Sequence, residues 1–231
     1  MKAVLQVEDL HTHFFTKEGV VKAVDGVSIT LKEESILALV GESGAGKSIT
    51  ALSILGLVPY PGKVVQGRAI FNGADLLAMD SANLRQVRGK EISIVFQDPR
   101  AALNPVLPIG VQVEEVVLAH ERMSKRAARA MAEELLNEMG LPDARRTLDR
   151  YSFELSGGMC QRVMISIALA LKPKVLIADE PTSNLDVTLQ ADILERLKAL
   201  CKELHSSVLL ITHDLGVVAE MSDEVAVMYA G

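Results

Sequence analysis

The chain contains few cysteines, no long apolar run and no excess of basic residues. Its two cysteines, Cys160 and Cys201, are far apart and form no C-x-x-C pair. This excludes a disulfide framework and a cysteine zinc site, and it indicates a reducing compartment. Charge precedes any apolar run at the N-terminus, and no apolar run approaches the ~20 residues that cross a bilayer. We therefore expect no signal peptide, and any role at a membrane to depend on a partner.

The charge balance argues against nucleic acid as a partner. The formal net charge is -6, whereas a polyphosphate backbone is bound by clustered lysine and arginine. The length of 231 residues, 49% of them hydrophobic, suits one large α/β domain, with room for a small inserted subdomain. It is too short for two full catalytic domains.

Apolar patterning predicts an α/β order interrupted by a helical segment. Alternating residues predict antiparallel strands near 3–7 and 26–31, and a continuously apolar run predicts a strand covered on both faces at 35–40. Helix-spaced apolar residues and abundant alanine and glutamate predict helices between 109 and 140. The remaining predicted elements are a helix at 47–57, strands at 67–71 and 91–97, a short helix at 83–88, strands at 175–178, 208–212 and 225–228, and a helix at 188–204.

A glycine-rich loop lies between the predicted strand at 35–40 and the following helix. The eight residues from Gly41 to Ser48 match G-x-x-x-x-G-K-[ST], the phosphate-binding P-loop. Its glycines allow backbone N–H groups to surround phosphates at a helix N-terminus. We expect Lys47 to reach the β- and γ-phosphates and Ser48 to complete a Mg²⁺ shell. The residues predicted to hold ATP here are Gly41, Glu42, Ser43, Gly44, Ala45, Gly46, Lys47, Ser48 and Ile49.

Two carboxylates end the apolar strand at 175–178. Because the carboxyl ends of parallel strands face the ligand crevice, Asp179 is predicted to hold Mg²⁺. Glu180 follows directly, and we expect it to orient and deprotonate the water that attacks the γ-phosphate. Together with the P-loop, the pair specifies a P-loop NTPase.

A second candidate anion site begins another predicted helix. Ser156, Gly157 and Gly158 precede the helical stretch from Cys160 to Leu171, so a hydroxyl and backbone amides are presented at a helix N-terminus. One chain has no need of two such sites. We expect this one to serve the nucleotide of a neighbouring copy.

These motifs, in this order and over essentially the whole chain, resemble the nucleotide-binding subunit of an ATP-binding cassette (ABC) transporter. The resemblance implies that Gln97 contacts Mg²⁺ and the attacking water, and that residues 183–186, ending in Asp186, cross a dimer interface. It implies that His213 contacts the γ-phosphate. An aromatic residue stacks on adenine in this family, and Phe14 is the candidate; Phe15 is adjacent, and either residue could instead belong to the core.

The implied fold is an α/β, RecA-like P-loop NTPase core with an antiparallel β-subdomain and an inserted α-helical subdomain. The expected boundaries are 1–97 and 162–231 for the core with the β-subdomain, and 98–161 for the helical signature subdomain. Relatives of this kind usually carry a C-terminal extension, which is absent from this sequence. The expected catalytic residues are Glu180, His213, Gln97 and Lys47, and the expected metal ligands are Ser48, Gln97 and Asp179.

Three sequence segments resemble the oligopeptide, dipeptide and nickel importer branch of the family: 41–44, 96–105 and 178–182. Ala45, the pair Ser183-Asn184 and Cys160 depart from the branch's usual residues. Cys160 stands where the branch usually has arginine, at the signature helix that the resemblance directs toward the dimer partner, so the strength of the dimer interface or the choice of partner is left open. Peptide, nickel chelate and oligosaccharide all remain open as the transported solute.

The resemblance implies a head-to-tail dimer of cassettes, with ATP between Lys47 of one cassette and Ser156 of the other. Whether the second cassette is another copy of this chain or a different ATPase subunit remains open. The other expected partners are transmembrane permease subunits and, indirectly, an extracytoplasmic solute-binding protein, with no nucleic acid. The expected location is the cytoplasmic face of the membrane. The alternatives are a non-transport ABC ATPase of DNA repair or translation and a regulatory module that holds ATP without hydrolysing it. Intact Glu180 and His213 oppose the latter.

Two histidines lie close together in the first predicted strand region. His11 and His13 share a strand face because they are two residues apart, a spacing that metal ligands can use. The sequence indicates no third ligand. We therefore expect them to be surface histidines.

Overall fold

The structure of the chain is a computed structural model that describes residues 2–183 and 185–231, and it contains two β-sheets. The first sheet is antiparallel in the order β2-β1-β4-β5. Its strands are β1 (Ala3–Thr16), β2 (Gly19–Lys32), β4 (Gly62–Phe71) and β5 (Ala74–Asp75). The predicted pairing of the first two strands is confirmed. Both strands are longer than predicted, because they continue past the alternating segments into the hairpin between Thr16 and Gly19.

The second sheet is parallel in the order β6-β7-β8-β3-β9. Its strands are β3 (Ile36–Val40), β6 (Ile92–Val95), β7 (Val175–Asp179), β8 (Ser207–Thr212) and β9 (Glu224–Val227). Every residue of β7 and β8 is buried, as their continuous apolar sequence predicts for strands covered on both faces. The chain thus has the α/β core that its motifs predicted.

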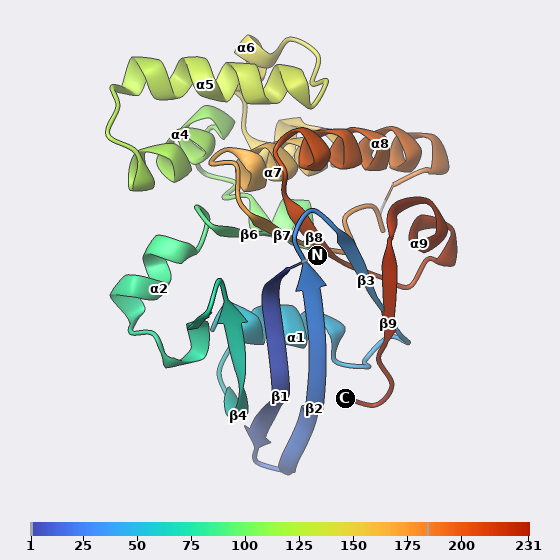
Figure 1. Ribbon diagram of the computed structural model, residues 1–231. Helices are drawn as coiled ribbons and strands as arrows, with labels where there is room; N and C mark the ends of the chain where they lie inside the picture. The colour runs from blue at the N-terminus through green and yellow to red at the C-terminus, as the bar shows by residue number, and fades with distance from the viewer. Residues whose placement is uncertain (1, 184) are drawn as a thin grey trace.

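Helices surround the parallel sheet and form a lobe above it (Figure 1). They are α1 (Lys47–Ile54), α2 (Ser81–Val87), α3 (Pro99–Ala102), α4 (Ile109–His120), α5 (Lys125–Glu138), α6 (Ala144–Thr147), α7 (Gly157–Leu169), α8 (Val187–Glu203) and α9 (Leu215–Met221), with short 3₁₀ turns at Leu76–Ala78 and Ser152–Glu154. No sequence pattern predicted α9, which is only seven residues long. Within the described residues, no helix combines the length and apolar character that crossing a membrane requires.

The helical lobe shares its hydrophobic core with the sheet. One cluster of buried residues runs from Val113 on α4 and Leu136 on α5 through Val163 on α7 to Leu210 on β8. A second cluster, on the other face of the sheet, joins β1 and α1. The expected boundaries of the helical subdomain, 98–161, remain a prediction, and hydrophobic packing is continuous between this segment and the sheet.

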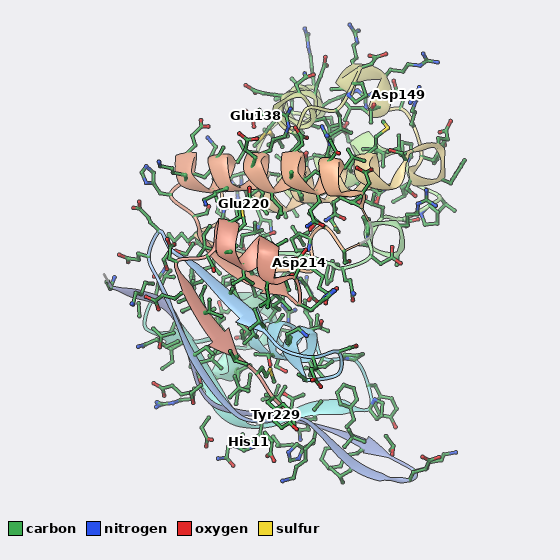
Figure 2. All side chains as sticks on the ribbon, turned by 90° about the vertical axis from the view of Figure 1, so that its right-hand side faces the viewer. His11, Glu138, Asp149, Asp214, Glu220 and Tyr229 are labelled. Atoms are coloured by element: carbon green, nitrogen blue, oxygen red, sulfur yellow. The ribbon has the colours of Figure 1, made fainter. Side chains whose placement is uncertain are left out.

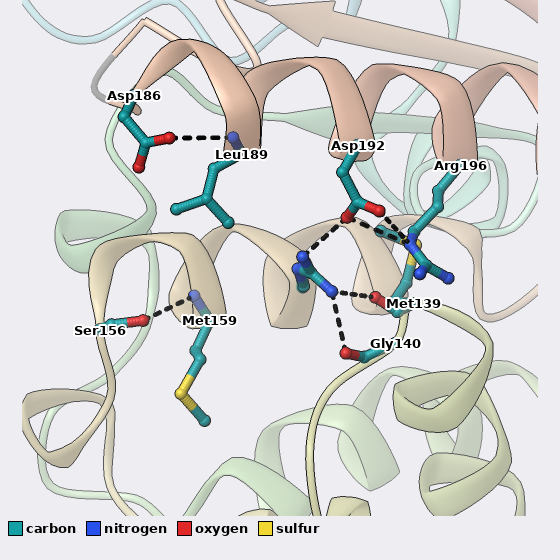
Figure 3. Close-up of polar contacts among 9 residues, drawn as sticks. Met139, Gly140, Ser156, Met159, Asp186, Leu189, Asp192 and Arg196 are labelled. Atoms are coloured by element: carbon teal, nitrogen blue, oxygen red, sulfur yellow. Dashed lines mark hydrogen bonds and ion pairs between the residues drawn. The ribbon is translucent and has the colours of Figure 1, made fainter.

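Arg162 links α7 to α8 and to the segment just after α5, and Figure 3 labels its partners Met139, Gly140 and Asp192. This residue of α7 donates hydrogen bonds to the backbone oxygens of Met139 at 3.1 Å and Gly140 at 2.9 Å, just after α5. It also pairs with Asp192 on α8 at 2.7 Å. Because the guanidinium group offers several donors in a fixed plane, it fixes α7 against both neighbours.

Candidate nucleotide-binding and hydrolysis site

The P-loop is shaped by two glycines at which no side chain fits. A Cβ atom on Gly46 would lie 2.1 Å from the backbone oxygen of Ala23, and Gly46 has φ 97°, a conformation that favours glycine. A Cβ atom on Gly41 would lie 2.3 Å from the backbone oxygen of Met228. The loop is therefore pressed against β2 and the segment after β9, and its shape depends on tertiary contacts as well as on its own sequence.

The N-terminus of α1 offers donors for phosphate. Its N-cap residue is Gly46, so no side chain caps the first backbone amides. Lys47 is 6% exposed, and its Nζ atom donates to the backbone oxygens of Gly41 at 2.8 Å and Glu42 at 2.9 Å. Free amides at a helix N-terminus and a buried ammonium group form an arrangement that suits phosphate oxygens.

Asp179 lies at the end of β7, next to the P-loop helix. Its Oδ1 atom accepts a hydrogen bond from Ser48 Oγ at 3.0 Å. The pKa of the Asp179 carboxyl group is raised, mainly by burial and also by the neighbouring Glu180 charge, although the Ser48 hydrogen bond and the nearby Lys47 act in the opposite direction. A buried carboxylate beside a hydroxyl is stabilised by a cation, and these oxygen donors suit Mg²⁺. The residues thus fit the metal that the sequence implied.

Glu180 is held between two side chains from neighbouring strands. Its Oε2 atom accepts from Gln97 Nε2 at 2.8 Å, and its Oε1 atom lies 2.9 Å from His213 Nδ1. Gln97 follows β6, Glu180 follows β7 and His213 follows β8, so the three meet because carboxyl ends of parallel strands share one edge of the sheet. The backbone N–H of Glu180 donates to Ile211 at 2.9 Å, which fixes this end of β7 to β8.

A cavity of about 730 Å³ opens at this edge of the sheet. The P-loop forms one side of it, and Gln97, Glu180 and His213 form the other. Its lining residues are Val40, Gly41, Glu42, Ser43, Gln97, Glu180, His213 and Leu215. Its volume is in the range of small-molecule sites. Leu215 was not predicted, because its exposure beside His213 is set by the position of α9 and by no sequence pattern.

The second predicted anion site lies elsewhere in the chain. Ser156 caps α7, and its Oγ atom accepts from the Met159 backbone N–H at 3.3 Å (Figure 3). Asp186 caps α8 in the same way, accepting from Leu189 at 3.0 Å. Neither residue lines the cavity beside the P-loop, nor do Gly157 and Gly158. Asn184, in the segment predicted to cross a dimer interface, lies outside the described residues.

Gly157 and Gly158 have different surroundings. A Cβ atom on Gly157 would have no neighbour within 4 Å, whereas one on Gly158 would lie 3.4 Å from Leu189 on α8. Gly157 therefore faces open space beside Ser156, which is exposed. One chain alone leaves this helix N-terminus accessible.

The two candidate aromatic residues lie on opposite faces of β1. Phe14 shares its face with Thr12, whose hydroxyl bonds Ser53 on α1 at 2.7 Å. That face is therefore directed toward the helix that follows the P-loop. Phe15 lies on the other face, half exposed and near His13. This arrangement favours Phe14 over Phe15 as the adenine contact. Ile49, which was also predicted to hold ATP, is partly buried and packs against the core.

Cys160 does not lie at the surface of the signature helix. It is fully buried, and its Sγ atom donates to the backbone oxygen of Ser152 at 3.4 Å. Its effect on a dimer interface remains a prediction, and it would have to act through the packing of α7, because the side chain does not reach the surface of the chain.

Comparisons with known proteins agree with this geometry. The family model described as ABC transporter matches residues 24–183. The chain is 50% identical to the dipeptide transport ATP-binding protein DppD of Bacillus subtilis, over its whole length and 69% of that protein. It is 45% identical to DppD of Escherichia coli over 99% of this chain and 70% of that protein.

Solved structures agree as well. The dimeric ATP-binding cassette MJ0796, in a post-hydrolysis state with ADP and Pi, matches with a TM-score of 0.88 and 29% identity, over 98% of this chain and 95% of that one. Together with the P-loop and the Glu180 cluster, this likeness confirms the fold and the ATPase activity that the sequence predicted. The chain belongs to the ABC transporter family, as an ATP-binding and ATP-hydrolysing subunit.

Proposed function

We propose that this chain energises the import of peptides across a membrane by binding and hydrolysing ATP. The observation that carries the proposal is the position of Glu180, held by Gln97 and His213 at the mouth of the P-loop cavity. The relatives named above are dipeptide transport proteins, and a further relative, 50% identical, is an oligopeptide transport ATP-binding protein of Bacillus subtilis. These names favour a peptide over a nickel chelate or an oligosaccharide, and transport over DNA repair or translation.

Hydrolysis at this site needs a proton acceptor and fixed phosphates. We assign the phosphates to Lys47 and to the free amides of α1, which stay in place during the reaction. Glu180 accepts the proton of the attacking water as the new oxygen–phosphorus bond forms, and the bond to the leaving ADP oxygen breaks. Gln97 and His213 orient the carboxylate and the water. His213 is also the group that reaches the γ-phosphate.

The proposed metal ligands are Ser48, Asp179 and Gln97. Bound Mg²⁺ would neutralise negative charge on the phosphates. Ser48 Oγ and Asp179 Oδ1 are already 3.0 Å apart, and Gln97 donates to Glu180, the residue that follows Asp179. Removal of the Asp179 carboxylate is therefore expected to weaken nucleotide binding and hydrolysis together.

The proposed active form is a dimer of cassettes. Ser156, Gly157 and Gly158 lie at an accessible helix N-terminus away from the cavity of their own chain, and Asp186 caps the neighbouring helix. A second cassette arranged head to tail would place these residues against the nucleotide held by Lys47. The dimeric structures of MJ0796 support this arrangement.

We assign a position at the cytoplasmic face of a membrane, reached through permease subunits, with a solute-binding protein delivering peptide on the other side. Phe96, which directly precedes Gln97, and Val106 are exposed apolar residues before and after α3 in the chain. They offer a contact through which a permease would sense the state of the site. The structure of cbiO1 from Clostridium perfringens, which is part of the ABC transporter complex cbiONQ, is similar to this chain with a TM-score of 0.80 and 28% identity, which supports a permease-bound role.

The test is peptide uptake. The chain is co-expressed with peptide permease subunits in a bacterial strain whose own ATPase subunits for peptide import are deleted, and growth on a peptide as the sole source of one amino acid is measured. We expect growth with the wild-type chain and none with Glu180→Gln. A chain that hydrolyses ATP, assembles with the permease and still gives no uptake would contradict the proposal.

A further inference from the structure

A cluster of metal-ligating side chains lies on the outer face of the antiparallel sheet, apart from the nucleotide cavity. It consists of His11 and His13 on β1 and Asp25 on β2, and one ligand atom from each lies within 4.8 Å of the others. Figure 2 shows His11 at the lower end of the molecule, far from the helical lobe that carries Asp149. The sequence did not reveal this third ligand.

A bulge in β2 brings Asp25 to this face. Leu10 pairs with Val27 and His11 with Asp25, so Gly26 is the extra residue, and it has φ 96°. With regular pairing Asp25 would lie opposite Thr12, on the buried face, because side chains alternate along a strand. The extra residue re-aims the Asp25 side chain toward the histidines.

We propose that this face binds one divalent transition-metal cation of the zinc class, with His11, His13 and Asp25 as ligands. Two imidazoles from one strand and a carboxylate from its neighbour form a three-ligand set with an open position for water. Imidazole suits Zn²⁺, Ni²⁺ and Cu²⁺, and it does not suit Mg²⁺. The cation of the nucleotide cavity is therefore not the expected occupant.

The ligand atoms are arranged for such a cation. His11 Nδ1 and Asp25 Oδ1 are 2.9 Å apart, and the His11 and His13 ring centres are 6.3 Å apart at 88°. Ligand atoms bound at about 2.1 Å from a metal in a tetrahedron lie roughly 3.4 Å from one another. Side-chain movements of about 1 Å would therefore bring the three ligand atoms to these separations. On binding, the proton between His11 and Asp25 leaves to solvent and the metal–Nδ1 bond replaces it.

Neighbouring groups already orient the ligands. His11 Nε2 lies 3.1 Å from Asp9 Oδ1, which is the carboxylate–histidine contact that fixes the ring of a metal ligand. Lys22 Nζ donates to Asp25 Oδ2 at 3.2 Å, so the other carboxylate oxygen, Oδ1, faces His11. Within the described chain, the buried Nε2 atom of His13 has no hydrogen-bond partner. A buried ring nitrogen without a hydrogen-bond partner is energetically unfavourable, and coordination of the His13 ring to a metal ion would offset this cost.

A bound cation would link β1 to β2 through His13, the residue that directly precedes Phe14. His13 also packs against Phe15, with ring centres 6.4 Å apart. The cation is therefore expected to stabilise the strand segment that carries the proposed adenine contact. This effect does not depend on peptide transport.

The test uses Zn²⁺ alone, titrated by calorimetry into the tag-free chain carrying His213→Gln. That background removes the histidine of the nucleotide cavity as a competing ligand. We expect one equivalent of Zn²⁺ to bind, and His13→Gln and Asp25→Asn each to weaken binding roughly 100-fold or more. His205→Gln is the matched control, because His205 has a single carboxylate partner, Glu34, at 3.1 Å, and we expect it to bind Zn²⁺ as its parent does.

Thermal unfolding followed by circular dichroism is the second readout. Zn²⁺ is expected to raise the unfolding temperature of the parent and of His205→Gln, and to leave that of Asp25→Asn unchanged. If His13→Gln does not fold, Asp25→Asn decides, because its side chain is partly exposed. Zn²⁺ affinity that is the same in Asp25→Asn and its parent would overturn the proposal. The proposal would also be overturned if the parent showed no saturable binding when the free Zn²⁺ concentration equals the protein concentration.

Discussion

Replacing Glu180 by glutamine removes one proton acceptor and leaves the surrounding contacts available. In the Glu180→Gln variant the amide oxygen can still accept from Gln97, as Oε2 does now at 2.8 Å. The amide NH₂ group can donate to His213 Nδ1, which lies 2.9 Å from the other oxygen. The side chain therefore keeps its place, and the change is confined to its ability to take a proton.

The expected loss is in the chemical step alone. A missing general base costs about 10²- to 10⁴-fold in rate, which corresponds to roughly 3 to 5.5 kcal/mol in the barrier. Lys47, Ser48 and Asp179 are untouched and continue to hold the nucleotide. We therefore expect ATP affinity to change less than about threefold, while kcat falls by at least about a hundredfold.

Phosphate release at saturating ATP measures the rate, and calorimetry with ATP measures binding. Light scattering after size exclusion, with ATP and then with ADP, reports the dimer, which we expect with ATP only. The matched control is Glu34→Gln, because Glu34 is also a glutamate paired with a histidine, His205, at 3.1 Å, outside the cavity. We expect it to hydrolyse ATP at the wild-type rate.

Each outcome bears on a different part of the reasoning. Hydrolysis by Glu180→Gln at the wild-type rate would refute the assignment of the general base. A loss of ATP binding equal to the loss of rate would show that the carboxylate holds the nucleotide and does not act in the chemical step. If hydrolysis stops and no dimer forms, the head-to-tail homodimer is refuted, and a second, different ATPase subunit becomes the expected partner.

Three further predictions follow from buried or hydrogen-bonded groups. Lys47→Ala is expected to weaken ATP binding at least about thirtyfold in calorimetry, because it removes a buried charged contact to phosphate; unchanged affinity would contradict this. Burial raises the pKa of Cys201 to about 12 and also raises the pKa of Cys160, so neither thiol is expected to react with iodoacetamide at pH 8 until the protein unfolds, as mass spectrometry would show. A hydrogen bond from Gln190 lowers the pKa of Asp214 in the folded chain. The ionised Asp214 carboxylate therefore stabilises the fold at pH values above its pKa in the unfolded chain, and this stabilisation is lost as the pH falls through its pKa in the folded chain. Asp214→Asn should therefore be less stable than wild type at neutral pH, and chemical denaturation at successively lower pH should show the difference in stability shrink once the pH falls below 3.8.

The sequence by itself determined the local units. The P-loop between a buried strand and a helix, and the carboxylate pair that ends β7, are each contiguous. Backbone geometry and apolar periodicity act over a few residues, so such segments can be predicted without knowledge of the rest of the chain. The same reasoning predicted the parallel core and the helical segment between 109 and 140.

Only the tertiary structure decided which distant groups meet and which are covered. Glu180 contacts Gln97, which lies 83 residues earlier, and His213, which lies 33 residues later. Cys160 is buried, since the packing of α7 against α8 and the rest of the core selects the covered face of the helix, which the signature motif alone does not indicate. Asp25 joins the two histidines because one extra residue, Gly26, reverses the face to which a strand side chain points, and the pairing register that creates this bulge depends on β1 and β2 together.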